Sequence, residues 1–97
     1  MYEVVIVKAD YEGWWLFDGW QDDIINRHQF NDTAQMLSGY KAILEQMKND
    51  YSSYIQGKYG LCAFFNACEI EFCEECDEDV QIFYTPIMTK NNEFYNN

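Results

Sequence analysis

Residues 32–51 read DTAQMLSGYKAILEQMKNDY, the clearest helical pattern in the chain and the stretch that decides its fold. Asp32 can cap a helix N-terminus, and Gln35 can reach back to it as in a capping box. Apolar residues then recur at three- and four-residue steps, which places one stripe against a sheet. The stripe comprises Met36, Leu37, Tyr40, Ile43, Leu44, Met47 and Tyr51. The pattern predicts one amphipathic helix from about Asp32 to Asp50.

The segments before this helix have the composition of strands and turns. Val4–Val7 is apolar on both faces of a strand, which indicates a central position in a sheet. Residues 10–13 are typical of a turn, and Trp14–Phe17 is predicted to be a second strand that forms a hairpin with the first. Within residues 20–29, two acids precede a pair of isoleucines, a pattern that fits a short helical turn.

After the helix, residues 51–60 are predicted to be a polar connection. Leu61–Phe65 has the composition of a strand, and a tight turn at Asn66 and Ala67 would pair it with residues 68–73. Alternation then resumes over Val80–Tyr84. It stops at Pro86, which has no backbone donor for a ladder and therefore suggests an edge strand. A helix beginning at Asp77 is the competing interpretation of this last segment.

These segments predict an α+β fold, in which an antiparallel β-sheet of about four to five strands packs against one main amphipathic helix. The length suits one ordinary domain, which we assign to residues 1–89. Four of the last eight residues are Asn, so we expect residues 90–97 to form a disordered C-terminal tail.

The charge balance limits the choice of partner. Six Lys and Arg residues against 17 Asp and Glu residues give a net charge of −11. Such a chain repels phosphate backbones and attracts cationic surfaces, which disfavours direct nucleic-acid binding and favours a protein partner with a basic surface. No apolar run is long enough to cross a bilayer, and Val4–Val7 is too short for a signal peptide, so we expect a cytoplasmic protein that does not bind membranes.

The run Cys73-Glu74-Glu75-Cys76-Asp77-Glu78-Asp79 is the most unusual in the chain. Cys73 and Cys76 have the spacing of half a zinc site. Cys62 and Cys68 are the candidates for a second pair, although five residues separate them, and His28 could complete a set with three cysteines. Thiol redox chemistry is a further alternative, which the neighbouring acids disfavour because negative charge opposes thiolate formation. The remaining interpretation is four reduced thiols without chemistry.

The acids of this run could instead form a docking face for Lys and Arg. A second cluster is aromatic and comprises Tyr11, Trp14, Trp15, Phe17 and Trp20. Strand alternation would send Trp14 to one face and Trp15 with Phe17 to the other, so some ring should stay exposed as a contact for a protein; the alternative is that all the rings pack in the core. The predicted partner-binding residues are Trp14, Trp20, Glu74, Glu75, Asp77, Glu78 and Asp79.

Two motifs are similar to the signatures of a known family. They are Trp14-Trp15-x-Phe17-x-Gly19-Trp20-x-x-Asp23-Ile24 and Cys73-Glu74-Glu75-Cys76-Asp77. From Tyr2 to about Tyr84 the chain resembles domain of unknown function 1033, a family of short acidic proteins from Gram-positive bacteria. The resemblance implies a cytosolic single-domain protein and no activity. This chain departs from the family pattern at Phe72, where members tend to have Trp, and at Phe83-Tyr84, where they tend to have Tyr-His.

No catalytic triad, phosphate-cradling loop or metalloprotease helix is present in the sequence. No Gly follows Gly60, so a calcium loop with its sharp turn is not expected either. We therefore expect an adaptor or regulator that binds a basic protein, without a cofactor, rather than an enzyme. The alternative is a zinc-binding or thiol-redox protein centred on Cys73 and Cys76.

Overall fold

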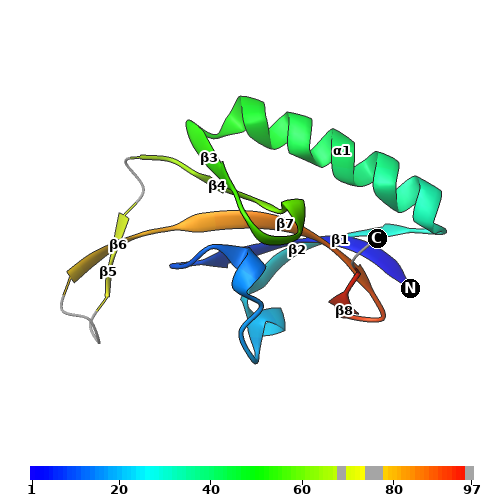
Figure 1. Ribbon diagram of the computed structural model, residues 1–97, viewed down its shortest axis with the longest axis horizontal. Helices are drawn as coiled ribbons and strands as arrows, with labels where there is room; N and C mark the ends of the chain where they lie inside the picture. The colour runs from blue at the N-terminus through cyan, green and yellow to red at the C-terminus, as the bar shows by residue number, and fades with distance from the viewer. Residues whose placement is uncertain (68–69, 74–77, 96–97) are drawn as a thin grey trace.

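The computed structural model describes residues 1–67, 70–73 and 78–95, with side chains for all of these except residues 70–73 and 78–79. One α-helix lies on an antiparallel sheet of six strands, and a separate two-stranded hairpin extends from the end of the sheet (Figure 1). The elements are β1 (Tyr2–Ala9), η1 (Gly13–Trp15), η2 (Trp20–Asp23), β2 (Ile24–Phe30), α1 (Thr33–Asp50), β3 (Ser53–Gln56), η3 (Lys58–Gly60), β4 (Cys62–Phe65), β5 (Ile70–Cys73), β6 (Glu78–Gln81), β7 (Phe83–Lys90) and β8 (Glu93–Phe94), where η marks a 3-10 turn. The α+β prediction is confirmed, with six strands in the main sheet instead of four or five.

The strand order of the main sheet is β2-β1-β7-β4-β3, and β8 pairs with β7. The predicted central strand is confirmed, because β1 pairs with β2 on one side and with β7 on the other. Val4–Val7 is buried. Ile6 packs with Met47, Cys62 and Phe64 beneath α1.

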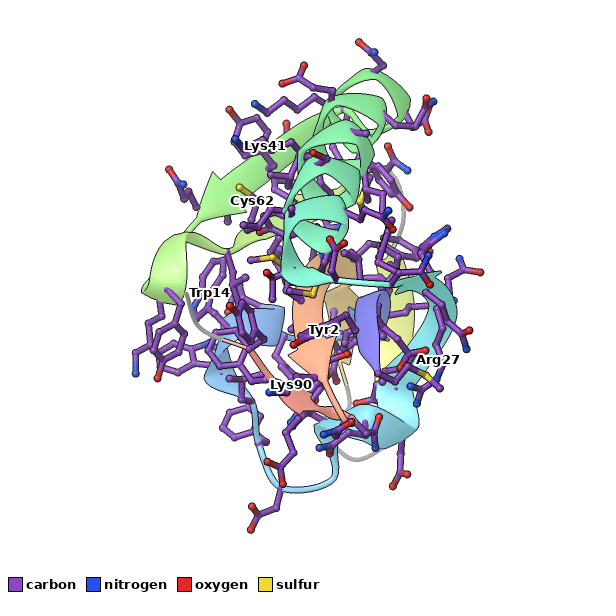
Figure 2. The ribbon with its side chains drawn as sticks, turned by 90° about the vertical axis from the view of Figure 1, so that its right-hand side faces the viewer. Tyr2, Trp14, Arg27, Lys41, Cys62 and Lys90 are labelled. Carbon is purple, nitrogen blue, oxygen red and sulfur yellow. The ribbon has the colours of Figure 1, made fainter. Side chains whose placement is uncertain are left out.

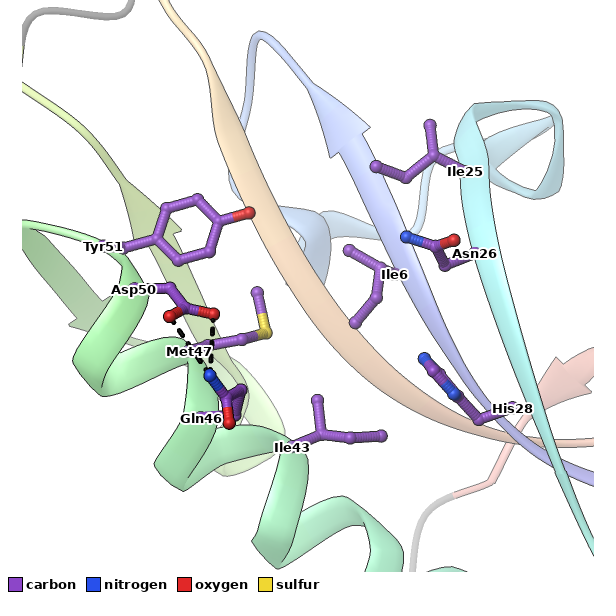
Figure 3. A pocket seen from close by; sticks show the side chains of 9 residues that line it. All are labelled: Ile6, Ile25, Asn26, His28, Ile43, Gln46, Met47, Asp50 and Tyr51. Atoms are coloured by element: carbon purple, nitrogen blue, oxygen red, sulfur yellow. Dashed lines mark hydrogen bonds between the residues drawn. The ribbon is translucent and has the colours of Figure 1, made fainter.

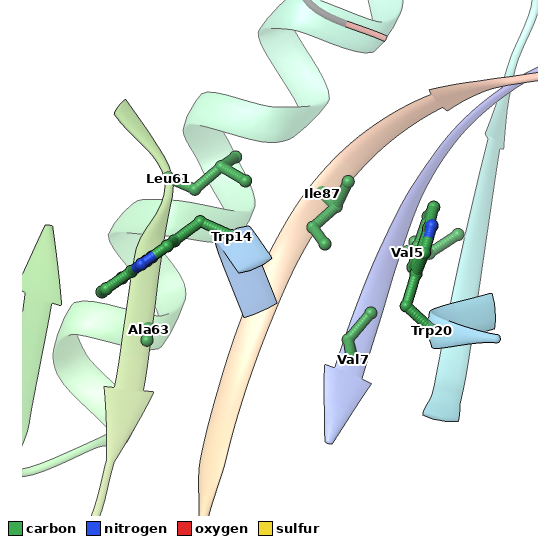
Figure 4. Close-up of a cluster of buried hydrophobic side chains, with 7 residues drawn as sticks. All are labelled: Val5, Val7, Trp14, Trp20, Leu61, Ala63 and Ile87. Carbon is green, nitrogen blue, oxygen red and sulfur yellow. The ribbon is translucent and has the colours of Figure 1, made fainter. Parts of the chain in front are cut away.

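The opposite face of the sheet is covered by the 3-10 turns η1 and η2. Their buried rings pack over alternate residues of the strands (Figure 4). This second cluster comprises Val5, Val7, Trp14, Trp20, Leu61, Ala63 and Ile87. The core therefore has two halves, one on each side of β1 and β7.

The helix begins and ends as the sequence predicts. The Gln35 N–H donates to Asp32 Oδ1 at 2.8 Å, and Gln35 Oε1 accepts from the Asn31 N–H at 3.3 Å, so the capping interaction is present. Met36 and Met47 are fully covered, and the rest of the stripe is half-buried. Lys41 lies on the exposed face, with Cys62 beneath the helix (Figure 2).

Two predictions for the first part of the chain are wrong. Trp14–Phe17 is not a strand, because Gly13–Trp15 forms a 3-10 turn and Leu16 takes a left-handed conformation at φ 48°. The hairpin partner of β1 is β2 instead, although a short helical turn does precede it at Trp20–Asp23. Residues 24–30 form this strand because β1 offers them a pairing edge.

Two further predictions for the second part are wrong. The connection at residues 51–60 contains strand β3, which pairs with β4. The hairpin predicted for residues 61–73 does not form, because β4 pairs with β3 and β7 while β5 pairs with β6. The alternating segment Val80–Tyr84 is extended and not the competing helix, but it is divided at Ile82 between the end of β6 and the beginning of β7.

Pro86 does not end a strand at an edge. It lies within β7, which is inside the sheet and pairs with β1 along its length, opposite Ile6. On its other side β7 pairs with β4 only at Tyr84, so that ladder has ended before Pro86. A residue without a backbone donor is tolerated where no ladder hydrogen bond is required.

Residues 90–95, which we assigned to a disordered tail, carry defined structure, whereas residues 96–97 lie outside the described part. Asn91 and Asn92 take φ values of 53° and 67°, the conformation of a two-residue hairpin turn, and join β7 to β8. The Tyr95 N–H donates to the Met88 carbonyl at 2.9 Å, and its ring meets that of Tyr2 edge-on.

Candidate functional site

The segment between β1 and β2, residues 10–23, is the most distinctive exposed feature of the described chain. It contains five carboxylates and no Lys or Arg. We call it the acidic aromatic loop. The carboxylates belong to Asp10, Glu12, Asp18, Asp22 and Asp23.

Two buried rings anchor this loop to the sheet. Trp14 is only 8% exposed and Trp20 only 7% exposed. A Cβ atom at Gly57 would lie only 2.4 Å from the Trp14 ring, so this ring requires a glycine beneath it. The Gly13 N–H donates to Thr85 Oγ1 at 3.0 Å, and a Cβ at Gly13 would lie 2.5 Å from the Thr85 Cβ. The loop backbone is therefore pressed against the sheet.

Two other rings of the loop face solvent. Trp15 is 46% exposed and Phe17 is 52% exposed. The Trp15 indole N–H donates to Glu12 Oε2 at 3.0 Å, and Lys58 Nζ lies 4.7 Å from the centre of the indole. Phe17 packs edge-on against Tyr11, with 5.0 Å between ring centres. The loop thus presents ring faces and carboxylates side by side.

Tyr11 links the exposed rings to the acids. Its hydroxyl donates to Asp23 Oδ2 at 3.0 Å. Burial raises the pKa of Tyr11 to about 12, and the hydrogen bond and negative charge of Asp23 act in the same direction. The phenol therefore stays neutral at any physiological pH and serves as a fixed donor that holds Asp23.

The structure changes the assignment of the partner-binding tryptophans. Trp14 and Trp20 were predicted to contact a partner, but both are in the core, and Trp15 and Phe17 are the accessible rings. The division of Trp14 from Trp15 and Phe17 agrees with the predicted alternation, although the segment is a 3-10 turn and not a strand. The signal that could have identified the anchor is Gly13, placed directly before the paired tryptophans.

The other predicted site residues are placed only in part. Glu74, Glu75, Cys76, Asp77 and Cys68 lie outside the described residues. The backbone of Cys73 ends β5, and those of Glu78 and Asp79 begin β6, but their side chains are outside the described part.

Cys62 is a free, buried thiol beneath α1, and burial raises its pKa while Lys48 partly opposes the effect. His28 is exposed on β2. Among the described side chains, no three His, Cys, Asp or Glu residues gather where they could hold a metal ion. Cys62 on β4 and His28 on β2 are separated by β1 and β7 in the sheet.

The fold and the acidic aromatic loop together define a small acidic α+β protein with one helix on an antiparallel sheet. The chain belongs to the family described as "Protein of unknown function (DUF1033)", whose model matches residues 1–96. Neither the curated proteins nor the solved structures compared with this chain contain a match. Among the helices of the described residues, none has both the length and the apolar character that a membrane span requires.

Proposed function

We propose that this protein is a non-enzymatic interaction or regulatory module of the cytoplasm that binds a Lys- and Arg-rich segment of a protein partner on the acidic aromatic loop. The net charge of −11 supports the proposal because it attracts a basic partner and speeds encounter with it. The five carboxylates of residues 10–23 concentrate this attraction beside two exposed rings.

The observation that carries the proposal is the contact between Lys58 and Trp15. The ammonium lies over the face of an indole whose N–H is held by Glu12, the geometry in which a tryptophan recognises a cation. Because Glu12 holds the Trp15 ring in place, the ring is preorganised to bind a cation. A Lys or Arg of the partner would replace Lys58 on Trp15 or stack on Phe17. The neighbouring acids would favour the incoming cation over water.

The test compares the wild-type protein with a variant of this surface and with a control variant of another surface. Wild-type protein, a Trp15→Ala/Phe17→Ala variant and a Tyr54→Ala/Ile55→Ala control are immobilised, and the proteins each retains from native lysate are quantified by mass spectrometry. Tyr54 and Ile55 are exposed on β3, at an edge of the sheet, so the control removes similar apolar area elsewhere.

We expect wild type and control to retain a partner with an excess of Lys and Arg, and the loop variant to lose it. The affinity of the purified pair should fall as salt rises, because screening weakens attraction between exposed charges. A partner that the loop variant retains equally, or whose binding is indifferent to salt, would contradict the proposal.

The alternative proposal is a zinc- or thiol-dependent protein centred on Cys73 and Cys76. It is supported by their spacing and by the position of Cys73 at the end of β5, opposite Glu78 of β6. Cys62 and Cys68 are its further candidate ligands, with Cys62 at the buried position described above. Retention of zinc by the purified protein tests it directly.

A further inference from the structure

Strand β2 forms one edge of the main sheet, so its outer row of backbone N–H and C=O groups has no strand partner among the described residues (Figure 1). Its sequence, Ile-Ile-Asn-Arg-His-Gln-Phe, contains no carboxylate although the chain as a whole is strongly acidic. Five of its seven residues, 25–29, are exposed. Such an edge is a template for the addition of another strand.

A groove of about 230 Å³ adjoins this edge on the helix side of the sheet (Figure 3). It exists because α1 moves away from β2 along its length: Gly39 lies against the Phe30 ring of β2, whereas Met47 packs with Phe64 of β4. The beginning of β2 is left uncovered. The groove is lined by Ile6, Ile25, Asn26, His28, Ile43, Gln46, Met47, Asp50 and Tyr51.

The groove has an apolar floor and one carboxylate at its rim. Asp50 is the only acidic residue among its lining residues, and Gln46 Nε2 donates to both of its oxygens at 3.1 Å. The carboxylate is therefore oriented by the helix that carries it. Its charge complements a Lys or Arg of an occupant, while the isoleucines and Met47 complement an apolar side chain.

A second copy of this chain is a poor occupant, because two bodies that each carry a net charge of −11 repel one another. We propose that an extended segment of a basic partner adds to the free edge of β2 as a further strand. It would place an apolar side chain at the mouth of the groove and a Lys or Arg, two positions along on the same face of the strand, directed towards Asp50 on the opposite wall. This site lies on the sheet face opposite the acidic aromatic loop and does not depend on that loop's function.

The probe is a synthetic peptide that repeats Ile-Thr-Lys-Thr, which places Ile and Lys on one face of a strand. Two control peptides are Ile-Thr-Glu-Thr repeats, with reversed charge, and Ile-Thr-Lys-Thr repeats whose backbone amides are all N-methylated, with the same charge but without the donors of a strand. Binding to isotope-labelled protein is followed by amide chemical shifts and amide hydrogen exchange. Asp50→Lys is compared with Glu45→Lys, which changes the net charge equally at a residue that is 76% exposed and does not line the groove.

We expect the Lys peptide alone to shift the amides of Ile24–Phe30 and to slow their exchange. Asp50→Lys should weaken its binding by about tenfold, because an attraction between opposite charges becomes a repulsion between like charges. Glu45→Lys and Trp15→Ala/Phe17→Ala should bind it as wild type does, and this last result separates the groove from the acidic aromatic loop.

The proposal would be overturned if the N-methylated or Glu peptide bound equally well, if the shifts were confined to residues 10–23, or if Glu45→Lys weakened binding as much as Asp50→Lys. It would also be overturned if the Lys peptide did not bind. A dimer in sedimentation, with slow exchange at Ile24–Phe30 in the absence of peptide, would show that a second copy occupies the edge instead.

Discussion

Replacing Trp14 with Ala should destabilise this protein far more than replacing its neighbour Trp15. Trp14 is 8% exposed and its ring contacts the backbone at Gly57, so its removal leaves a cavity between a 3-10 turn and the sheet. Truncation of a core aromatic residue costs about 3–5 kcal/mol. That is a large part of the ~5–15 kcal/mol by which a typical domain is stable.

The cost of Trp15→Ala should be about 1 kcal/mol or less. Its ring is 46% exposed, and its contact with Lys58 is a surface cation–π interaction worth about 0.5–1 kcal/mol. The hydrogen bond to Glu12 is also exposed, so water replaces it when the indole is removed. The two adjacent tryptophans therefore differ severalfold in their effect on the free energy of unfolding.

Urea unfolding followed by far-ultraviolet circular dichroism measures this difference as a shift in midpoint at unchanged slope. If Trp14→Ala does not fold, Trp14→Phe leaves a smaller cavity and should still lower the midpoint below that of Trp15→Ala. If Trp15→Ala proves as costly as Trp14→Ala, the division of the loop into inner and outer rings is wrong. The proposed binding surface would then fail with it.

Three further predictions concern the helix, two tyrosines and the cysteine pair. Gly39→Ala should destabilise the wild type, because a Cβ would lie 2.2 Å from the Phe30 ring. In a Phe30→Ala variant the same change should stabilise the protein by about 1 kcal/mol through helix propensity. If Gly39→Ala changed the free energy of unfolding with the same sign in both backgrounds, the packing of Gly39 against Phe30 would be contradicted. Burial is the main cause that raises the pKa of Tyr11 and of Tyr40 to about 12, so the stability that these neutral phenols contribute should be complete below pH 10 and lost as pH rises through about 12. Urea unfolding at each pH, alongside tyrosinate absorbance, checks this, and constant stability over that interval would refute it. Under the zinc alternative, native mass spectrometry should find zinc that Cys73→Ser removes, and a metal-free fresh protein would exclude that alternative.

The parts of the fold that the sequence predicted are those with local causes. The cap at Asp32 is a contact across three residues, and the buried run Val4–Val7 shows its central position by its own composition. Both follow from rules that need no knowledge of the rest of the chain. The helix and the central strand were therefore predictable, and with them the α+β class.

The errors have distant causes. Trp14–Phe17 has the composition of a strand, but contacts with Thr85 and Gly57, far along the chain, fold its first residues into a 3-10 turn. Ile24–Phe30 has a mostly exposed and polar pattern and becomes a strand because β1 pairs with it. The accessible rings and the groove both follow from these two segments, so a reading of local pattern could not place the candidate sites.

Open sheet edges and high negative charge are connected features of this molecule. Both ends of the main sheet, β2 and β3, expose their residues, and exposed edges invite copies of a protein to associate. A net charge of −11 on every copy opposes that association without any need to block the edges themselves. The same charge favours the approach of a basic chain, for which an unblocked edge offers backbone hydrogen bonds. Repulsion between copies thus leaves the β2 edge accessible to a partner of opposite charge, and salt that screens the repulsion should also weaken that partner's binding.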